Sequence, residues 1–291
     1  MIVDLVLLLS IGLFSGLFGG LLGIGGSIIL LPALAILFSH RYPPDYQHVF
    51  QAAAMIMNFF VALPSALAHR KEKNLLGPLL KWLVPSGIIA IVLGVMASNL
   101  HVFQGDGTRH LQHLLAIFLF YVLGYNLYRL VKRNRLPDVT PEMAGKISPW
   151  KTTFAVGLPM GFSGGLLGIG GGALCVPLLQ VLLKIPLPRA IANSSATIVW
   201  TSLLGAVYKT LSVPDTTGGP WTAVKLALLI IPTSFIGGYL GARLIYVLPR
   251  NVIRVIFCGL MLYSGLKLLF TGPNQPTPAE PIQHPITNTQ H

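Results

Sequence analysis

Residues 12–32 read GLFSGLFGGLLGIGGSIILLP, and residues 157–177 read GLPMGFSGGLLGIGGGALCVP. The two stretches are 145 residues apart throughout, and 12 of their 21 positions are identical. A weaker likeness joins residues 85–94 (PSGIIAIVLG) to residues 232–241 (PTSFIGGYLG). Such self-similarity indicates two related halves. We therefore divide the chain into a first repeat at 1–131, a charged linker at 132–149, a second repeat at 150–271 and a C-terminal tail at 272–291.

The composition indicates a membrane protein. Hydrophobic residues make up 53% of the 291 residues and charged residues only 10%, with a mean hydropathy of +0.72. Soluble domains carry about 25% charged residues, so a soluble enzyme, a disordered chain and a disulfide scaffold are excluded. The apolar runs are continuous rather than alternating, which disfavours a transmembrane β-barrel. We expect an all-α polytopic membrane protein.

Each repeat offers three apolar runs near the length of about 20 residues that a spanning helix needs. They lie at 49–68, 79–98 and 111–131 in the first repeat, and at 190–208, 223–246 and 252–270 in the second. Each repeat also opens with a longer run, 5–38 or 154–183, that has glycines in its middle. We interpret each long run as a hairpin of two short or broken helices that meet at the glycines. This interpretation predicts about eight to ten membrane segments.

The Lys and Arg residues predict how the repeats are oriented, because cytoplasmic loops carry an excess of these residues. If each glycine hairpin enters and leaves on one side, 15 of the 20 Lys and Arg residues lie inside. The five outside are Arg41, Arg109, Lys209, Lys225 and Lys267. Equivalent spans then run in opposite directions, which predicts an inverted-topology repeat, a design common among secondary transporters. We expect a multi-pass protein of the inner membrane, with both termini outside and a disordered tail.

The glycines at the centre of each hairpin are candidates for an anion site. Broken helices occur in a membrane where the backbone is buried in protein or lines a water-filled cavity. A half-helix that starts at Ser27 or Gly172 would direct N–H groups and the positive end of its dipole at that cavity. The candidates are Gly23, Gly25, Gly26, Ser27, Gly168, Gly170, Gly171 and Gly172. The outer glycines, Gly12, Gly16 and Gly20 with Gly157, Gly161 and Gly165, instead form ladders typical of helix packing.

Polar side chains within the spans form a second set of candidates. Gln51 and Asn58 lie seven residues apart on one face of the run 49–68. In the run 190–208, Asn193, Thr197 and Thr201 form one stripe, with Ser194, Ser195 and Ser202 beside it. Such residues face the interior of a bundle, where interhelical hydrogen bonding is the alternative role. Neutral donors of this kind can hold an oxyanion without trapping it. The candidates are Gln51, Asn58, Asn193, Ser194, Ser195 and Thr197.

Missing residue types narrow the function further. None of the eight Asp and Glu residues lies at the centre of a span, which argues against a cation site or a carboxylate proton relay. Any proton is therefore expected to travel on the substrate or through water. Lys209, Lys225 and Lys267 fall near outer helix ends, where their ammonium groups are expected to snorkel. We expect no catalytic residues, metal or cofactor, and no nucleic-acid partner; lipid surrounds the chain, and a homodimer is left open.

The doubled segments GLLGIGGSIILLP and GLLGIGGGALCVP resemble the sulfite exporter TauE/SafE family, also called the 4-toluene sulfonate uptake permease family. The resemblance covers both halves and the basic linker. It implies secondary transport of sulfur-containing oxyanions such as sulfite, sulfonates, thiosulfate, sulfate or sulfoacetate. By motif it points to Gly23, Gly25, Gly26 and Pro32, with Gly168, Gly170, Gly171 and Pro177.

Two features of the resemblance stay open. The polar cluster at 193–195 has only Gln51-Ala52-Ala53-Ala54 near its first-half counterpart, so the halves are expected to contribute unequally to the site. An anion channel with the same lining is the first alternative to a transporter. A membrane redox protein is the second alternative, disfavoured because catalytic and cofactor motifs are missing.

Overall fold

The computed structural model describes residues 2–38, 46–103, 108–131, 149–245, 247 and 250–270, and these residues contain no β-strand. The first repeat contributes α1 (Ile2–Leu22), α2 (Ser27–Phe38), α3 (Tyr46–Lys71), α4 (Gly77–Ser98), the 3₁₀ turn η1 (His101–Phe103) and α5 (Thr108–Val131). The second contributes α7 (Trp150–Leu167), α8 (Gly172–Leu182), α9 (Leu187–Leu211), the 3₁₀ turn η3 (Asp215–Thr217), α10 (Gly219–Leu244) and α11 (Arg250–Phe270). The predicted all-α fold is confirmed. The tail and all of the linker except Pro149 lie outside the described residues, so the domain division stays a prediction.

Several of the described helices have the length and apolar character of membrane spans. The five that meet this criterion are α1 (over Leu5–Leu22), α3, α4, α9 and α10. The helices α2 and α8 are apolar but shorter. Over their described residues, α5, α7 and α11 are not among the five, although α5 and α11 form where spans are predicted. The protein is therefore a multi-pass membrane protein.

Both glycine-rich runs are broken where the sequence predicts. The first helix of each hairpin ends at Leu22 or Leu167, and the second begins at Ser27 or Gly172. The connections need glycine because their φ angles lie in the left-handed region, between +63° and +85°, which L side chains rarely adopt. These positions are Gly23, Gly25, Gly168, Gly170 and Gly171.

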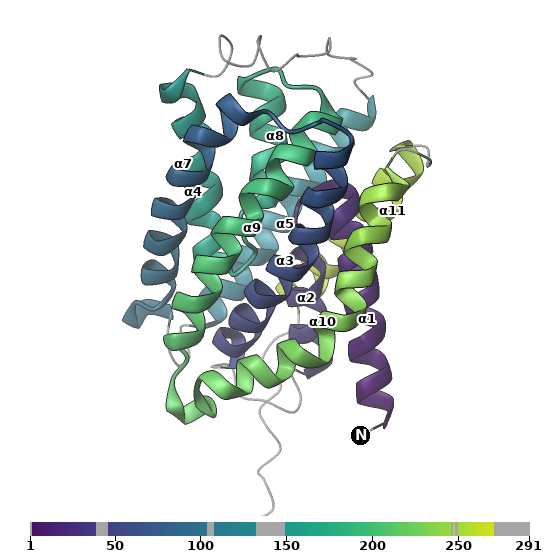
Figure 1. Ribbon diagram of the computed structural model, residues 1–291. Coiled ribbons are helices and arrows are strands. Elements are labelled where there is room, and N and C mark those ends of the chain that lie inside the picture. Colours follow the sequence, from purple (N-terminus) through teal and green to yellow (C-terminus); the bar gives the residue numbers. More distant parts are fainter. Residues whose placement is uncertain are drawn as a thin grey trace, which may run out of the picture.

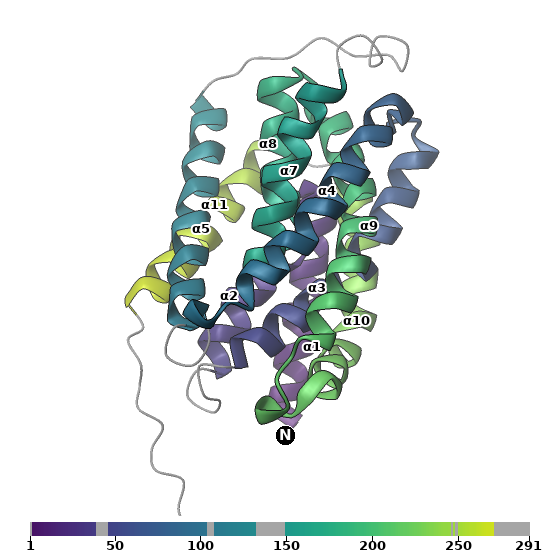
Figure 2. The same cartoon turned by 90° about the vertical axis from the view of Figure 1, so that its left-hand side faces the viewer.

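The two hairpins approach each other from opposite ends of the molecule. In both views the pair α1 and α2 occupies the lower part of the bundle, and the pair α7 and α8 occupies the upper part (Figures 1 and 2). The glycine connections consequently meet between the two ends. This placement is what two hairpins with opposite entry sides would produce.

Helix packing joins the two repeats crosswise. The helix α1 packs against α10 and α7 packs against α4, while α3 packs against α9 and α5 against α11. Exchanging α1 with α7, α3 with α9, α4 with α10 and α5 with α11 leaves this set of contacts unchanged. Such an exchange is expected of two repeats related by a two-fold axis.

The outer glycines allow these helix pairs to approach closely. A Cβ atom added at Gly16 of α1 would run into the backbone of Ser234 in α10. One added at Gly165 of α7 would run into the backbone of Ile91 in α4. The ladders therefore serve helix packing, as predicted.

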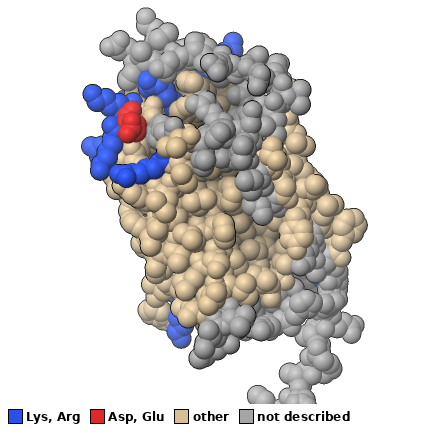
Figure 3. Space-filling view, turned by 90° about the vertical axis from the view of Figure 1, so that its right-hand side faces the viewer, with Lys and Arg blue, Asp and Glu red and all other residues tan. Residues whose placement is uncertain are grey.

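Lys and Arg side chains collect at the ends of the bundle. On the face in Figure 3 most of them lie together at the upper end and a smaller group lies at the lower end, while the described residues of the wall between include no Lys, Arg, Asp or Glu. The upper end holds the end of α3, which is Lys71, and the connection to α4, which contains Lys73, whereas the chain begins at the lower end (Figure 1). We call the upper end the basic end. An uncharged wall between charged ends suits a bilayer.

Candidate functional site

The glycine connections of the two hairpins touch each other inside the bundle. A Cβ atom added at Gly172, the first residue of α8, would lie 2.6 Å from the carbonyl carbon and oxygen of Ile24. On either side, α3 packs against α2 and α9 packs against α8. The structure thus brings the candidate glycines of both repeats into one place, which we call the hairpin centre: residues 23–27 and 168–172.

Asn58 of α3 holds both hairpins at this centre. Its Oδ1 accepts a hydrogen bond from the Ser27 N–H (2.9 Å), and its Nδ2 donates to Ser27 Oγ (2.7 Å) and to the Ile169 carbonyl (3.1 Å). The side chain is fully buried. A single amide therefore fixes the start of α2 against the connection that precedes α8.

Further side chains of α3 and α9 bind the hairpin of the opposite repeat. Gln51 Nε2 donates to the Leu166 carbonyl (3.3 Å), so α3 also holds the end of α7. In the reverse direction, Ser194 Oγ of α9 donates to the Gly23 carbonyl (2.6 Å). These crossed bonds tie the relative position of the two hairpins to the packing of α3 on α9.

Two buried side-chain oxygens at the centre have no hydrogen-bond partner within the described residues. They are Ser202 Oγ and Gln51 Oε1, and both side chains are fully buried. A Cβ atom added at Gly170 would lie 2.8 Å from Ser202 Oγ, so this hydroxyl faces the hairpin centre. An unpaired buried polar group costs about 1–3 kcal/mol, which a ligand with the right chemistry would remove.

The starts of the two half-helices differ in how many of their N–H groups have an acceptor. In α2 the Ser27 N–H is bonded to Asn58. In α8, the N–H groups of Gly171, Gly172 and Ala173 have no acceptor among the described backbone and side-chain groups. First-turn N–H groups lack intrahelical partners and favour anions. Among the described groups, the Gly26 and Ile28 N–H groups of the first hairpin also lack acceptors, so the start of α8 leaves one more N–H group unpaired than the start of α2.

Three of the predicted side chains lie away from the hairpin centre. Asn193 Oδ1 accepts from the Leu76 N–H (2.9 Å), and its Nδ2 donates to the Arg189 carbonyl (2.7 Å). Asn193 therefore holds the connection between α3 and α4. Ser195 Oγ lies 3.1 Å from Ser65 Oγ, and Thr197 donates to the Asn193 carbonyl within its own helix.

The structure adds Thr201 and Ser202, which the sequence places in the polar cluster of α9 but which were not selected as ligands. Thr201 Oγ1 lies 3.2 Å from the Thr197 carbonyl of its own helix and 3.4 Å from the Gly170 carbonyl, and Ser202 Oγ faces the same glycine. The i, i+4 stripe that contains Asn193 and Thr197 continues to Thr201. The periodicity therefore marked the correct helix face, while only the packing shows which turn reaches the hairpin centre.

The prediction that Lys209 snorkels to the membrane surface is wrong. Lys209 is fully buried, and its Nζ donates to Ser98 Oγ (2.8 Å) and Asn99 Oδ1 (3.0 Å). The i, i+4 stripe of α9 extends through Gly205 to Lys209, so it faces inward like Thr201. Lys225 is exposed, and the side chain of Lys267 lies outside the described residues.

A cavity of about 930 Å³ opens at the basic end, where α3 and α10 finish. Arg70, Lys71 and Arg243 lie on its wall together with Glu72. The guanidinium of Arg243 stacks on the Tyr239 ring at 4.5 Å. A mouth with more positive than negative charge raises the local concentration of anions.

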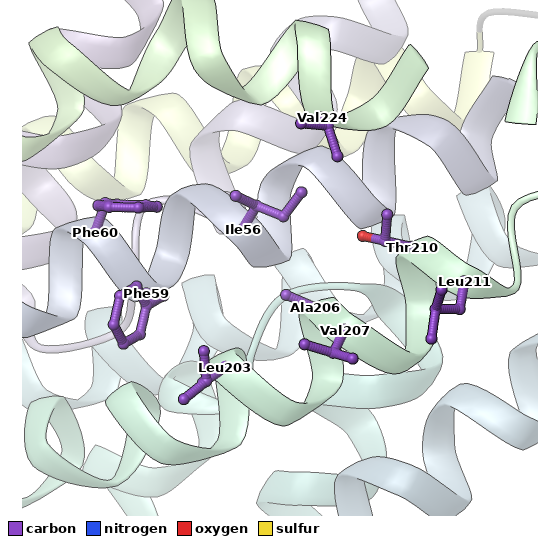
Figure 4. Close-up of a pocket in the computed structure, with 9 residues that line it drawn as sticks. All are labelled: Ile56, Phe59, Phe60, Leu203, Ala206, Val207, Thr210, Leu211 and Val224. Carbon is purple, nitrogen blue, oxygen red and sulfur yellow. The ribbon is translucent and has the colours of Figure 1, made fainter. Parts of the chain in front are cut away.

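A second pocket is unsuited to an anion. It has a volume of about 400 Å³ and lies between α3, α9 and α10 (Figure 4). Its walls are side chains such as Ile56, Phe59, Leu203 and Val207, and among the labelled residues only Thr210 presents a polar oxygen. Apolar walls cannot replace the hydration of an oxyanion. No group of three His, Cys, Asp or Glu side chains in the described part of the chain offers a metal site either.

These features define a class: a multi-pass helical membrane protein with broken-helix hairpins that meet inside the bundle, the construction used by membrane transporters. Residues 8–268 match the family described as Sulfite exporter TauE/SafE, and the chain belongs to this family. The resemblance seen in the doubled glycine segments is thereby confirmed. The protein is a multi-pass membrane protein of that family.

Relatives of this chain carry general names. It is 29% identical to the probable membrane transporter protein MamO of Paramagnetospirillum magneticum, over 92% of this chain and 45% of MamO. It is 27% identical to MJ0441 of Methanocaldococcus jannaschii and 26% identical to YunE of Bacillus subtilis, both probable membrane transporter proteins, of which it covers 95% and 98%. The chain thus spans about half the length of MamO but nearly all of the other two. No solved structure matches the chain.

Proposed function

We propose that this protein is a secondary transporter that moves sulfur-containing oxyanions, such as sulfite, sulfonates, thiosulfate or sulfoacetate, across the cytoplasmic membrane. The observation that carries the proposal is the start of α8. Within the described residues, its N–H groups at Gly171, Gly172 and Ala173 lack acceptors, and the hydroxyl of Ser202 beside them lacks a hydrogen-bond partner. The family description supports sulfur as the central atom of the anion.

The donors at this site are neutral, which sets the expected affinity and selectivity. Backbone N–H groups and the Ser202 hydroxyl replace part of the hydration of an oxyanion without adding a full positive charge. An Arg would bind through stronger, charge-assisted bonds, whereas release is as necessary as binding for a transporter. We therefore expect modest affinity and tolerance of several tetrahedral or pyramidal oxyanions.

Transport requires the hairpins to separate. In the structure Gly172 lies against Ile24, so an anion reaches the N–H groups of α8 only when the two hairpins move apart. Because crossed hydrogen bonds tie each hairpin to the opposite repeat, this movement is coupled to sliding of α3 on α9. Opposite entry of the hairpins, in an inverted repeat, would expose the anion alternately to the two sides.

The proposal is tested by flux into proteoliposomes that contain the purified protein. We expect saturable uptake of sulfite, thiosulfate or a sulfonate, with counterflow when unlabelled anion is trapped inside, and little uptake of chloride. Uptake that rises linearly with concentration, without counterflow, would identify a channel instead. No flux of any sulfur oxyanion by folded protein would rule out the proposed substrate class.

The proposed orientation puts the basic end in the cytoplasm and both chain termini outside. Glu72 and Thr216 are exposed at opposite ends, whereas Thr217 is buried and unsuitable for labelling. In a background lacking the free, buried Cys175 and Cys258, we expect Thr216→Cys to react with an impermeant maleimide on whole cells. Glu72→Cys should react only after permeabilisation. The reverse pattern would invert the protein, and reaction of both from one side would disprove the inverted repeat.

A further inference from the structure

Lys209 is a buried lysine whose hydrogen-bond partners are all neutral. Its Nζ lies 2.8 Å from Ser98 Oγ, 3.0 Å from Asn99 Oδ1 and 2.8 Å from His48 Nδ1. Three acceptors match the three hydrogens of an ammonium group. None of the contacts that the structure gives Lys209 is with a carboxylate. An ionisable residue buried within a membrane span is commonly functional, because a purely structural role would be served without its desolvation cost.

The ends of two helices stabilise a positive charge at this position. Lys209 lies in the last turn of α9, while Ser98 is the last residue of α4 and Asn99 follows it. The carboxyl end of a helix carries a partial negative charge. Two such ends meet at Nζ, so the site favours a cation while providing no fixed anion to neutralise it.

His48 gives the ammonium a basic neighbour. The Nε2 of His48 lies 3.1 Å from the Phe103 carbonyl oxygen, which only accepts hydrogen bonds, so Nε2 carries a hydrogen. The unprotonated Nδ1 then faces Lys209 Nζ at 2.8 Å. One hydrogen therefore lies between two basic nitrogens, and either can hold it as an N–H bond while the other accepts.

Among the described residues, no other acidic or basic side chain at this end of the bundle is buried. The turns η1 and η3 at the same end carry His101 and Asp215, both exposed, and α10 carries Lys225, also exposed. From α4 only the neutral Ser98 and Asn99 face the pair.

The pair continues the helix faces that build the hairpin centre. Lys209 follows Ser202 by seven residues on α9, a rise of about 10 Å. His48 precedes Gln51 by three residues, one turn, on α3. Charges separated by this distance inside a protein interact appreciably, because little solvent screens them. An anion at the hairpin centre and a proton on the pair should therefore stabilise each other.

We propose that Lys209 and His48 form the proton-binding group that couples anion movement to a proton. This inference rests on the proposed transport function. With an anion bound, the pair takes up one proton from water as a new N–H bond; when the anion leaves, that N–H bond breaks and the proton returns to water. The redox state of every group stays the same. The spans have no carboxylate at their centres that could bind a proton, and the pair supplies such a site.

The test combines flux with a direct measurement of the proton. In proteoliposomes, Lys209→Met is expected to lower flux driven by a pH gradient at least tenfold and to spare counterflow exchange. Lys225→Met, at an exposed lysine, is the matched control and should behave as the wild type. Because Lys209→Met removes buried hydrogen bonds, His48→Gln provides a milder variant. Its amide oxygen still accepts from Nζ but cannot take a proton, and the same selective loss is expected.

A second arm does not depend on transport. In full-length protein labelled with ¹³C at lysine Cε, the signal absent from Lys209→Met reports the charge state of Lys209. We expect this signal to shift as the pH is changed, and His48→Gln to change that titration. A signal that stays fixed, or gradient-driven flux that survives both variants, would overturn the proposal. If the wild type moves no anion while the signal still titrates, the proposed transport function is wrong and the coupling role is wrong with it. The finding that the pair binds and releases a proton would remain.

Discussion

Replacing Gly170 by leucine is expected to abolish anion flux while the protein remains folded in the membrane. An added Cβ atom would lie 2.6 Å from Asn58 Nδ2 and 2.8 Å from Ser202 Oγ, at a φ of +70°. The backbone strain is on the order of 1–3 kcal/mol, less than the usual stability of about 5–15 kcal/mol. The side chain, however, fills the space in which the anion would meet its donors. We expect counterflow to fall by about a hundredfold or more, since binding is lost.

Matched variants separate a lost site from lost packing. Gly124→Leu lies in α5, where an added Cβ atom meets nothing within 4 Å, and should leave flux and yield unchanged. Gly12→Leu would place its Cβ 2.9 Å from Ile230 of α10 and should lower the yield of folded protein. Yield and monodispersity in detergent, followed by counterflow per folded molecule, distinguish these effects. Normal counterflow by folded Gly170→Leu protein would show that the anion does not bind at the hairpin centre.

The Asn58→Asp substitution is expected to have a similarly large effect through charge. It keeps the shape of the side chain, but the two hydrogen bonds donated by Nδ2 are lost and a negative charge enters the hairpin centre. At about 4 Å and an effective dielectric constant of about 20, two like charges repel by roughly 4 kcal/mol. Anion affinity should therefore fall by about a thousandfold, measured as the concentration that half-saturates counterflow.

Two comparisons make the Asn58 result interpretable. Asn58→Leu loses the hydrogen bonds without adding charge, so it should lower thermal stability and affect affinity less than Asn58→Asp does. Asn193→Asp places the same charge on α9 at the connection between α3 and α4, away from the hairpin centre. We expect it to change stability more than affinity. Equal affinities for Asn58→Asp and the wild type would show that no anion binds near Asn58.

The sequence predicts the broken helices well because a local requirement determines them. Left-handed φ angles select glycine, and the run of glycines before Ser27 and Gly172 leaves few other places for a helix to restart. The all-α class follows just as directly from the length and hydropathy of the apolar runs.

The site itself is less predictable because it depends on which turns of packed helices meet. Asn58 and Asn193 are both amides on inward faces, yet one binds the hairpins and the other a helix connection. Periodicity predicts which face of a helix is buried, but it does not predict which turn of that face contacts a given partner. Lys209 lies where the stripe that continues from Thr201 places it, on the inward face of α9, and not at the surface that its nearness to a helix end predicts.

The most direct test locates the anion in the protein. Selenite has the pyramidal shape of sulfite, and its selenium atom scatters anomalously. In crystals of the full chain grown with selenite, we expect one anomalous peak at the start of α8. Its oxygens should lie within about 2.7–3.2 Å of the N–H groups of Gly171 and Gly172 and of Ser202 Oγ. Selenite bound elsewhere, with this centre empty in protein that transports selenite, would contradict the account.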